Sequence, residues 1–296
     1  MSRPIRALAG DESRTGSGVA LAAGSSASMQ FGASVGALTF PVLGPVGVVS
    51  IRQLFVAAIY LLLARPRLRA FTRSQWLLVA ALALVFSVMG ICVYAAFERI
   101  GTGLTVTLEF LGPLGVAIAT SRRLIDIGCA VLAAVGVVVI VQPGPSTDVA
   151  GIAFALAAAL TWAAYILLSR RLGAELSGVQ GTAAANLISA VLLLPFAVFW
   201  LVAHTPPLWA LGFLLVGAVL SSVVPYTLDL MALRRLTPGL FSTLTSLHPV
   251  WAVLLGWVVL HQALSPVELL GVALVVASNV IVAGAAVRRS RAKRGL

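Results

Sequence analysis

The segment 96–120 reads AFERIGTGLTVTLEFLGPLGVAIAT, a short polar entry followed by an apolar run that contains threonine, glycine and one glutamate. A second segment, 232–256, reads ALRRLTPGLFSTLTSLHPVWAVLLG. Aligned without gaps, the two segments match at several positions, among them Gly103 with Gly239, Thr107 with Thr243, Leu111 with Leu247, and Pro113 with Pro249. Each apolar run is about 20 residues long, which is the length a helix needs to cross a membrane. The chain therefore contains an internal repeat built around a predicted membrane span.

The composition of the whole chain agrees with a membrane protein. Of its 296 residues, 60% are hydrophobic and 10% are charged, and its mean hydropathy is +1.06. Soluble domains are about 45–50% apolar and about 25% charged, so the chain lies outside that class. A disordered chain needs low hydrophobicity, and a transmembrane barrel needs a polar–apolar alternation that this sequence lacks. The composition therefore predicts an all-α integral membrane protein.

Ten apolar stretches are long enough to cross a membrane as helices. They lie at approximately 18–38, 46–64, 76–95, 102–120, 124–142, 150–168, 182–202, 209–231, 239–260 and 267–286. The first stretch is as long as a span and leads directly into the next, which favours an uncleaved helix over a signal peptide. The connections are short and leave no room for a soluble catalytic or nucleotide-binding domain. We therefore expect ten transmembrane helices.

The basic residues predict the orientation of these helices. The chain has 20 Lys and Arg against 9 Asp and Glu, and the cytoplasmic loops of membrane proteins collect positive charge. When both termini are placed in the cytoplasm, every Lys and Arg except Arg52 and Arg99 lies on the cytoplasmic side. We therefore expect cytoplasmic tails at 1–17 and 287–296, the second of them suited to anionic lipids. Nucleic-acid binding is the weaker explanation of this charge.

The repeat predicts two halves of opposite orientation. Its copies occupy the fourth and ninth predicted spans, so they enter the membrane from opposite faces. Inverted repeats are characteristic of secondary transporters, in which the substrate site lies near the midplane between the halves. We therefore predict two inverted five-helix repeats, at 18–142 and 150–286. Chance similarity between two apolar segments is the alternative.

Three ionisable side chains stand out within the predicted spans, where charges are costly and usually face an interior site or one another. Arg52 and Glu109 each lie about six residues from the outer end of a span, a depth of about 9–10 Å. They either form a structural ion pair or bind a zwitterion together, with Arg52 taking a carboxylate and Glu109 an ammonium group. Asp229 lies near the cytoplasmic end of its span and is either an interfacial charge or a proton-binding group.

Polar residues recur on single faces of three predicted helices. They are Gln30 in the first span, Thr105 beside Glu109 in the fourth, and Ser242, Thr245, Ser246 and the adjacent His248 in the ninth. Such stripes either line a substrate site or form hydrogen bonds between helices. Prolines add predicted helix breaks, because each removes a backbone donor within a span. These are Pro113, Pro249 and Pro225, the last of them beside Tyr226.

The sequence lacks the motifs of other function classes. The only lysine is Lys293, so there is no GxxxxGK[ST] loop and transport must be driven by a gradient. No HExxH metal motif occurs, and Glu109 and Asp229 lie towards opposite faces, which argues against an intramembrane enzyme. We expect no cofactor and no metal site. A non-transporting scaffold subunit would not require charges at a matched depth.

Five stretches carry a resemblance to a known family. They are SMQFGAS at 28–34, LGPVGVVSIRQL at 43–54, TLEFLGPLGVAIATSRRLID at 107–126, YILLSRRLGAE at 165–175 and LSSVVPYTLDLMALRRL at 220–236. With them the chain resembles the drug/metabolite transporter superfamily from about residue 18 to residue 285. Within it the chain is similar to the EamA-type ten-helix branch, and most like the threonine/homoserine exporters of the bacterial inner membrane.

The resemblance implies a proton-linked or exchange-type exporter of small amino acids, with a central cavity between two five-helix halves. It carries Arg52, Glu109 and Pro113 over as cavity residues, with Tyr226 and Asp229 as more distant candidates. The chain departs from many relatives in two places. It has His248–Pro249 where they have Glu-Pro, and His261–Gln262 where they have Gly-Glu.

The sequence thus predicts a secondary exporter, a monomer or a homodimer, that works by alternating access. Arg52, Glu109, the polar stripes and Tyr226 are the predicted substrate-binding residues, and Glu109 and Asp229 the predicted proton-coupling residues. Export of drugs, aromatic metabolites or nucleobases is the alternative substrate class. The identity of the substrate and of the coupling ion stays open at this point.

Overall fold

The computed structural model describes residues 3–64, 66, 68–119, 128–129, 131–133, 135–136, 139, 148–176, 179–233, 235 and 248–293. These residues form helices and short connections, with no strand among them. The α-helices are α1 (Arg3–Ala37), α2 (Phe40–Ala64), α3 (Arg73–Ile100), α4 (Thr102–Glu109), α5 (Leu111–Ala119), α7 (Val149–Glu175), α8 (Gln180–His204), α9 (Leu208–Ala218), α10 (Val224–Leu233), α12 (His248–Leu260) and α13 (Pro266–Lys293). A 3₁₀ turn, η1 (Leu68–Ala70), precedes α3, and a π-helical segment, η2 (Val219–Val223), joins α9 to α10.

Five helical stretches are long and apolar enough to cross a membrane. They are Phe40–Ala64, Arg73–Ile100, Val149–Gly173, Gln180–His204 and Leu208–Asp229, and each coincides with a predicted span. Shorter apolar helices cover Thr102–Val116, His248–Leu260 and Pro266–Ser278. The prediction of an all-helical membrane protein is confirmed for the described residues. The count of ten helices stays a prediction, because much of 124–142 and 239–247 lies outside the described residues.

The outer surface of the helices is apolar where a soluble protein would be polar. Along α8 the side chains of Val191, Phe199 and Val202 are all more than half exposed. Leu208 at the start of α9 is 86% exposed. Contiguous apolar surface of this kind is rare on soluble proteins. These faces are therefore suited to contact with lipid.

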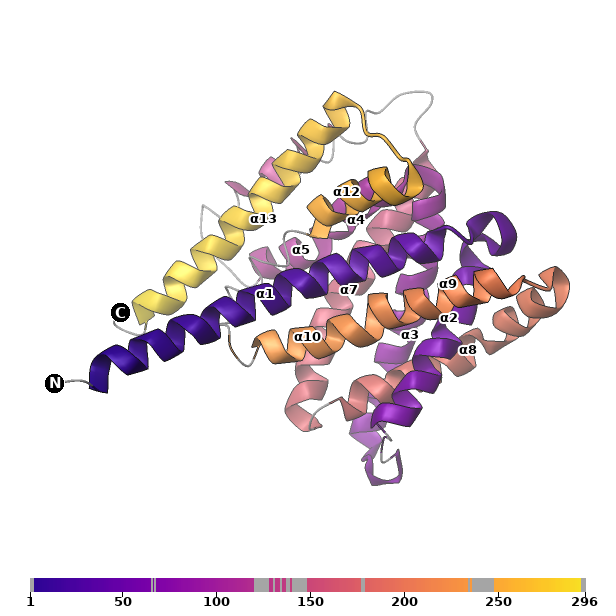
Figure 1. Ribbon diagram of the computed structural model, residues 1–296, viewed down its shortest axis with the longest axis horizontal. Helices are drawn as coiled ribbons and strands as arrows, with labels where there is room; N and C mark the ends of the chain where they lie inside the picture. Colours follow the sequence, from indigo (N-terminus) through magenta and orange to yellow (C-terminus); the bar gives the residue numbers. More distant parts are fainter. Residues whose placement is uncertain are drawn as a thin grey trace.

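Helix α1 lies at the centre of the arrangement and packs against α9, η2, α10 and α12 (Figure 1). Its start and the end of α13 lie on the same side of the molecule (Figure 1). On the other side of the bundle, α3 packs against α7 and α8, and α2 packs against α8. The predicted tail at 1–17 is largely helical, since α1 begins at Arg3.

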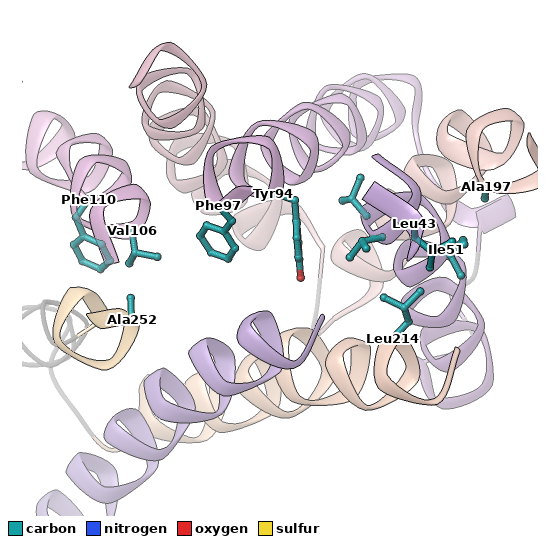
Figure 2. Packing of buried hydrophobic residues seen from close by; sticks show 11 residues of the cluster. Leu43, Ile51, Tyr94, Phe97, Val106, Phe110, Ala197, Leu214 and Ala252 are labelled. Carbon is teal, nitrogen blue, oxygen red and sulfur yellow. The ribbon is translucent and has the colours of Figure 1, made fainter. Parts of the chain in front are cut away.

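A central cluster of buried apolar side chains joins the helices. Figure 2 shows Val106 and Phe110 facing Ala252 at one end of this cluster, and Tyr94 and Phe97 of α3 in the middle. At the other end lie Leu43, Ile51, Ala197 and Leu214, from α2, α8 and α9. Polar residues placed beside this cluster are therefore held by well-packed helices rather than by loops.

Helix α2 bends at Gly44, directly before Pro45. Gly44 has φ +60°, a conformation that glycine adopts without steric cost. The Leu43 carbonyl next to the bend accepts a hydrogen bond from the indole N–H of Trp200 on α8. Further along α2, Gln53 Nε2 donates to Asn186 Oδ1 of α8 at 2.9 Å. These contacts fix α2 against α8 and leave the preceding residue, Arg52, to face another direction.

The predicted span 102–120 is interrupted at Phe110, where α4 ends and α5 begins. Pro113 explains the interruption, because it has no N–H to donate to the carbonyl of Glu109 four residues earlier. The backbone carbonyl of Glu109 therefore lacks its usual N–H partner in the helix. The side chain of the same residue is a candidate for substrate binding.

The two copies of the repeat pack against each other with opposite directions. At the start of α4, Thr102 donates its backbone N–H to Gln262 Oε1 at 2.9 Å, and its hydroxyl lies 3.1 Å from the same oxygen. The Thr102 hydroxyl also reaches the Ala252 carbonyl of α12 at 3.3 Å. At the end of α4, the Phe110 ring lies 5.5 Å from the ring of His248, the first residue of α12. Helices α4 and α12 are therefore antiparallel neighbours.

Replacing Gln262 by alanine is expected to destabilise the protein. The change removes the side chain that caps α4, and the loss of a helix cap costs about 1 kcal/mol. The apparent unfolding temperature in detergent should fall by about 2–4 °C. Gln262→Glu, which keeps the acceptor oxygen, is the matched control. Equal unfolding temperatures for Gln262→Ala and the unchanged protein would contradict the prediction.

Helix α1 approaches η2 closely at Gly32. A Cβ atom on Gly32 would lie 2.5 Å from the Ser221 backbone nitrogen and 2.8 Å from the Leu220 carbonyl carbon. A Cβ atom on Gly36, one turn further, would lie 3.1 Å from the hydroxyl oxygen of Tyr94. The GxxxG spacing of these two glycines thus serves contacts within the chain.

Gly32→Ala is therefore expected to destabilise the protein by about 1–3 kcal/mol, the usual effect of overpacking. Gly212→Ala on α9 is the matched control, because nothing lies within 4 Å of the added Cβ there. Thermal unfolding of both variants in one detergent measures the difference. If both variants unfold at the same temperature, the close approach of α1 to η2 is not needed for stability.

An ion pair fixes the start of α7. The Asp148 carboxylate accepts a hydrogen bond from the Gly151 N–H at 2.8 Å and pairs with Arg99 Nε at 3.1 Å. The hydrogen bond from Gly151 contributes most to lowering the pKa of Asp148, and Arg99 adds to it. A carboxyl group with a lowered pKa in the folded protein stabilises it above the unfolded-state pKa. This contribution is lost as the pH falls through the folded-state value.

Candidate functional site

Arg52 of α2 is half-buried and is held by three side chains. Its Nη1 donates to Ser221 Oγ at 2.8 Å and to Ser222 Oγ at 3.2 Å, both in η2. Its guanidinium carbon lies 5.3 Å from the centre of the Tyr94 ring, a cation–π contact. The Nε atom is buried, and no hydrogen-bond partner for it occurs in the described part of the chain.

The π-helical segment explains how two consecutive serines reach one guanidinium. Pro225 has no N–H for the carbonyl of Ser221, and the helix is widened into the π form over Val219–Val223. The Ser28 hydroxyl on α1 donates to the Leu220 carbonyl at 2.8 Å, and the Ser25 hydroxyl donates to the Pro225 carbonyl at 3.2 Å. The region around Pro225 is thus a break in regular α-helix whose carbonyls are partly satisfied by α1.

Glu109 closes α4 and is buried, with 8% of its surface exposed. Among the described residues, no cation lies within 4 Å of its carboxylate, and no side chain or backbone N–H donates a hydrogen bond to it. Arg52 and Glu109 are therefore not a direct ion pair in this structure. A buried carboxylate without a partner is costly unless it takes up a proton or faces a bound cation.

A third group of side chains is formed around Phe110, the residue that follows Glu109 in the sequence. Gln30 Nε2 of α1 lies 3.3 Å from His248 Nδ1 of α12, and both residues are buried. The His248 ring lies 5.5 Å from the ring of Phe110 and 6.1 Å from that of Trp162 on α7. Phe110 and Trp162 in turn meet edge to face at 4.7 Å. Phe110, Trp162 and His248 thus form an aromatic group, and Gln30 of α1 binds its histidine.

The remaining predicted residues are distributed as follows. Thr105 is fully buried, and its hydroxyl donates to the Gly101 carbonyl of its own helix at 2.7 Å, so it is not free for a ligand in this conformation. Asp229 is half-buried on α10, the helix that packs along α1. Pro249 is the second residue of α12. Ser242, Thr245 and Ser246 lie outside the described residues, as does the side chain of Tyr226.

Several site residues were not singled out by the sequence. They are Tyr94, Ser221 and Ser222 around Arg52, and Phe110 and Trp162 around His248. The Ser221–Ser222 pair before Pro225 was the available signal, since polar side chains next to a helix break inside a span are unusual. The aromatic side chains gave no signal, because aromatic residues are common in apolar helices.

Six buried polar atoms lack a hydrogen-bond partner within the described ranges. Two of them, Arg52 Nε and the Tyr94 hydroxyl, belong to the Arg52 group. The other four are Ser26 Oγ on α1, the Tyr60 hydroxyl on α2, Ser169 Oγ on α7 and Trp251 Nε1 on α12. Buried polar groups in proteins are nearly always hydrogen-bonded, so an unpaired one calls for a ligand, a water molecule or a change of conformation. The two unpaired atoms of the Arg52 group are therefore available to a ligand.

A separate cavity of about 280 Å³ lies where the α3–α4 and α12–α13 connections meet. Its lining includes Glu98, Gly101, Gln262 and Glu268. Glu268 Oε2 accepts from the Ser265 N–H at 2.7 Å, so this carboxylate caps the start of α13. The cavity borders the cap of α4 and does not include Arg52, Glu109 or His248.

The chain is similar to known membrane transporters. The sequence profile of the EamA-like transporter family matches residues 149–284. The threonine/homoserine exporter RhtA of Escherichia coli (strain K12) is 33% identical over 259 residues, which is 86% of this chain and 86% of that protein. RhtA of Salmonella typhimurium (strain LT2) is 33% identical over 258 residues, with 85% of this chain and 86% of that protein covered.

A solved crystal structure shares the fold. It superposes with a TM-score of 0.59 at 17% sequence identity and covers 89% of this chain and 95% of that one. The relatives are membrane transporters, not enzymes. The chain belongs to the EamA-like transporter family of the drug/metabolite transporter superfamily, and it is similar to threonine/homoserine exporters over most of its length.

Proposed function

We propose that this protein exports small amino acids such as threonine and homoserine across the bacterial inner membrane. The observation that carries the proposal is that the half-buried Arg52 and the buried Glu109, which have opposite charges, are not paired with each other. Arg52 is bound to two neutral hydroxyls, and Glu109 is bound to no described residue. A zwitterion carries one charge of each sign, so it complements both side chains at once.

The role of Arg52 in this proposal is to bind the substrate carboxylate. A guanidinium has five N–H donors, and a carboxylate is matched by two of them in parallel. Ser221 and Ser222 use one nitrogen, Nη1, so Nε and Nη2 are left for the substrate. The face of the Tyr94 ring stabilises the positive charge while the site is empty.

The role of Glu109 is to bind the ammonium group and, when no substrate is present, a proton. The two ligands compete for one carboxylate, so uptake of a proton favours release of the amino acid. This competition links export to the proton gradient. An exchange of one amino acid for another uses the same competition and needs no proton.

The orientation and the inverted halves are part of the same proposal. The start of α1 and the end of α13 lie on one side, which supports an arrangement with both termini in the cytoplasm (Figure 1). The antiparallel contact of α4 with α12 supports two halves of opposite direction that meet at the site. Movement of one half against the other would expose the site alternately to each side of the membrane.

The test is transport by the purified protein in liposomes. Radiolabelled threonine, homoserine, tryptophan and uracil are offered one at a time, with and without an imposed pH gradient. We expect uptake of threonine and homoserine, and faster uptake with the gradient. Uptake of uracil alone would replace amino-acid export by the alternative substrate class, and uptake of tryptophan alone would replace small amino acids by aromatic ones. Absence of any flux in a correctly inserted protein would favour a scaffold subunit.

A further inference from the structure

The hydrogen bond between Gln30 and His248 fixes which nitrogen of the histidine ring carries its proton. The contact runs from Gln30 Nε2 to His248 Nδ1 at 3.3 Å. An amide nitrogen donates and does not accept, so Nδ1 is the acceptor in this pair. A neutral imidazole carries one proton, which must then reside on Nε2.

The Nε2–H group has no partner among the residues that the structure describes. His248 has 6% of its surface exposed, and within the described ranges its one polar contact is with Gln30. The rings of Phe110 and Trp162 lie around the imidazole at 5.5 and 6.1 Å. They pack against its sides and supply no oxygen to accept its hydrogen bond. A single oriented donor is thus held between apolar walls.

We infer that His248 Nε2–H recognises the side-chain hydroxyl of the exported amino acid, and that Gln30 positions it. The inference rests on the proposed function. His248 lies against Phe110, the residue directly after Glu109, so the imidazole packs on the end of α4 that carries the carboxylate. In threonine the hydroxyl and the ammonium group are on adjacent carbon atoms. The inference therefore assigns these two groups of one substrate to His248 and Glu109.

This arrangement discriminates against amino acids of the same shape without the hydroxyl. Valine has a methyl group in place of the threonine hydroxyl, and norvaline has one in place of the homoserine hydroxyl. Either of them would bury the Nε2–H group without an acceptor. A site that bonds a substrate hydroxyl rejects the analogue that lacks it, because its own polar group is left unpaired. We expect at least about tenfold weaker binding of valine and norvaline.

The experiment measures competition by each amino acid against radiolabelled threonine in proteoliposomes. The quantity compared is the ratio of the half-inhibitory concentrations of valine and threonine, and of norvaline and homoserine. Ratios within one preparation do not depend on how much protein is inserted. We expect ratios of about ten or more in the unchanged protein.

His248→Phe keeps a flat ring between Phe110 and Trp162 but removes the donor. Both ratios should fall to near one. His204→Phe is the matched control, since His204 is exposed at the end of α8 and stacks on Trp200. It should leave the ratios unchanged. Gln30→Leu, which releases the ring from its fixed tautomer, should lower the ratios part of the way, and this shift separates a positioning role from a merely structural one.

The outcomes distinguish the inference from the proposed function. If the unchanged protein binds threonine but does not prefer it over valine, or if His248→Phe keeps the preference, the inference is wrong and amino-acid export stands. If neither threonine nor homoserine competes with anything the protein transports, the proposed function itself fails. If His248→Phe is not inserted, His248→Gln replaces it, and its retained amide donor should preserve part of the preference.

Discussion

Glu109→Gln is expected to reduce threonine export to less than one hundredth of its value in the unchanged protein. The change removes the negative charge that we assign to the substrate ammonium, and leaving a buried charge without its partner costs about 3–5 kcal/mol. Such a cost corresponds to more than a hundredfold loss of affinity. The substitution adds no volume to α4, so the protein should still fold and insert.

The measurement is made in two modes with the same liposomes. Net export driven by a pH gradient depends on both proton and substrate binding, whereas exchange of labelled for unlabelled threonine depends only on substrate binding. Loss of both modes assigns Glu109 to the ammonium group. Glu98→Gln is the matched control, since this exposed carboxylate lies at the end of α3. Full activity of Glu109→Gln in both modes would contradict the proposed role of this residue.

Arg52→Gln is expected to lower the affinity for threonine by a similar factor and to change what the protein recognises. The unchanged protein should bind threonine far more tightly than threoninol, which has an alcohol in place of the carboxylate. Without the guanidinium this preference should disappear, because the remaining amide offers no positive charge to a carboxylate. Competition by threoninol and threonine against a labelled substrate measures the preference directly.

Two further variants make the Arg52 result specific. Arg52→Lys keeps the charge but cannot bond two serines and a carboxylate together, so it should recover only part of the preference. Arg69→Gln changes an exposed arginine in η1 and should have no effect on recognition. An Arg52→Gln variant that still prefers threonine over threoninol would show that another group binds the carboxylate.

The membrane-spanning character of the chain could be predicted from the sequence because it depends on the hydropathy and charge of short stretches of residues. Hydropathy over about 20 residues and the distribution of basic loops do not require knowledge of which helices touch. The prediction that Arg52 and Glu109 are the unusual side chains has the same origin, since a charge is conspicuous in any apolar window. The break after Glu109 likewise follows from Pro113 alone.

The interior partners of these residues could not be predicted, because they depend on how helices pack across the chain. Ser221 and Ser222 reach Arg52 from 169 and 170 positions away. Gln30 and His248 are 218 positions apart. A polar stripe on an α-helix has the same sequence pattern whether it faces a polar stripe on another helix, a ligand or an apolar helix.

The sequence by itself determined that this is an all-helical membrane protein with one arginine and one glutamate that stand out within apolar stretches. It could not decide whether these two charges form a pair, because separation along the chain does not give distance in space. Only the tertiary structure decided that Arg52 is held by the serines of a π-helical segment and that Glu109 is left without a described partner. The physical reason is the packing of α1 against η2 at Gly32 and of α4 against α12, which fixes the side chains that each charge can reach.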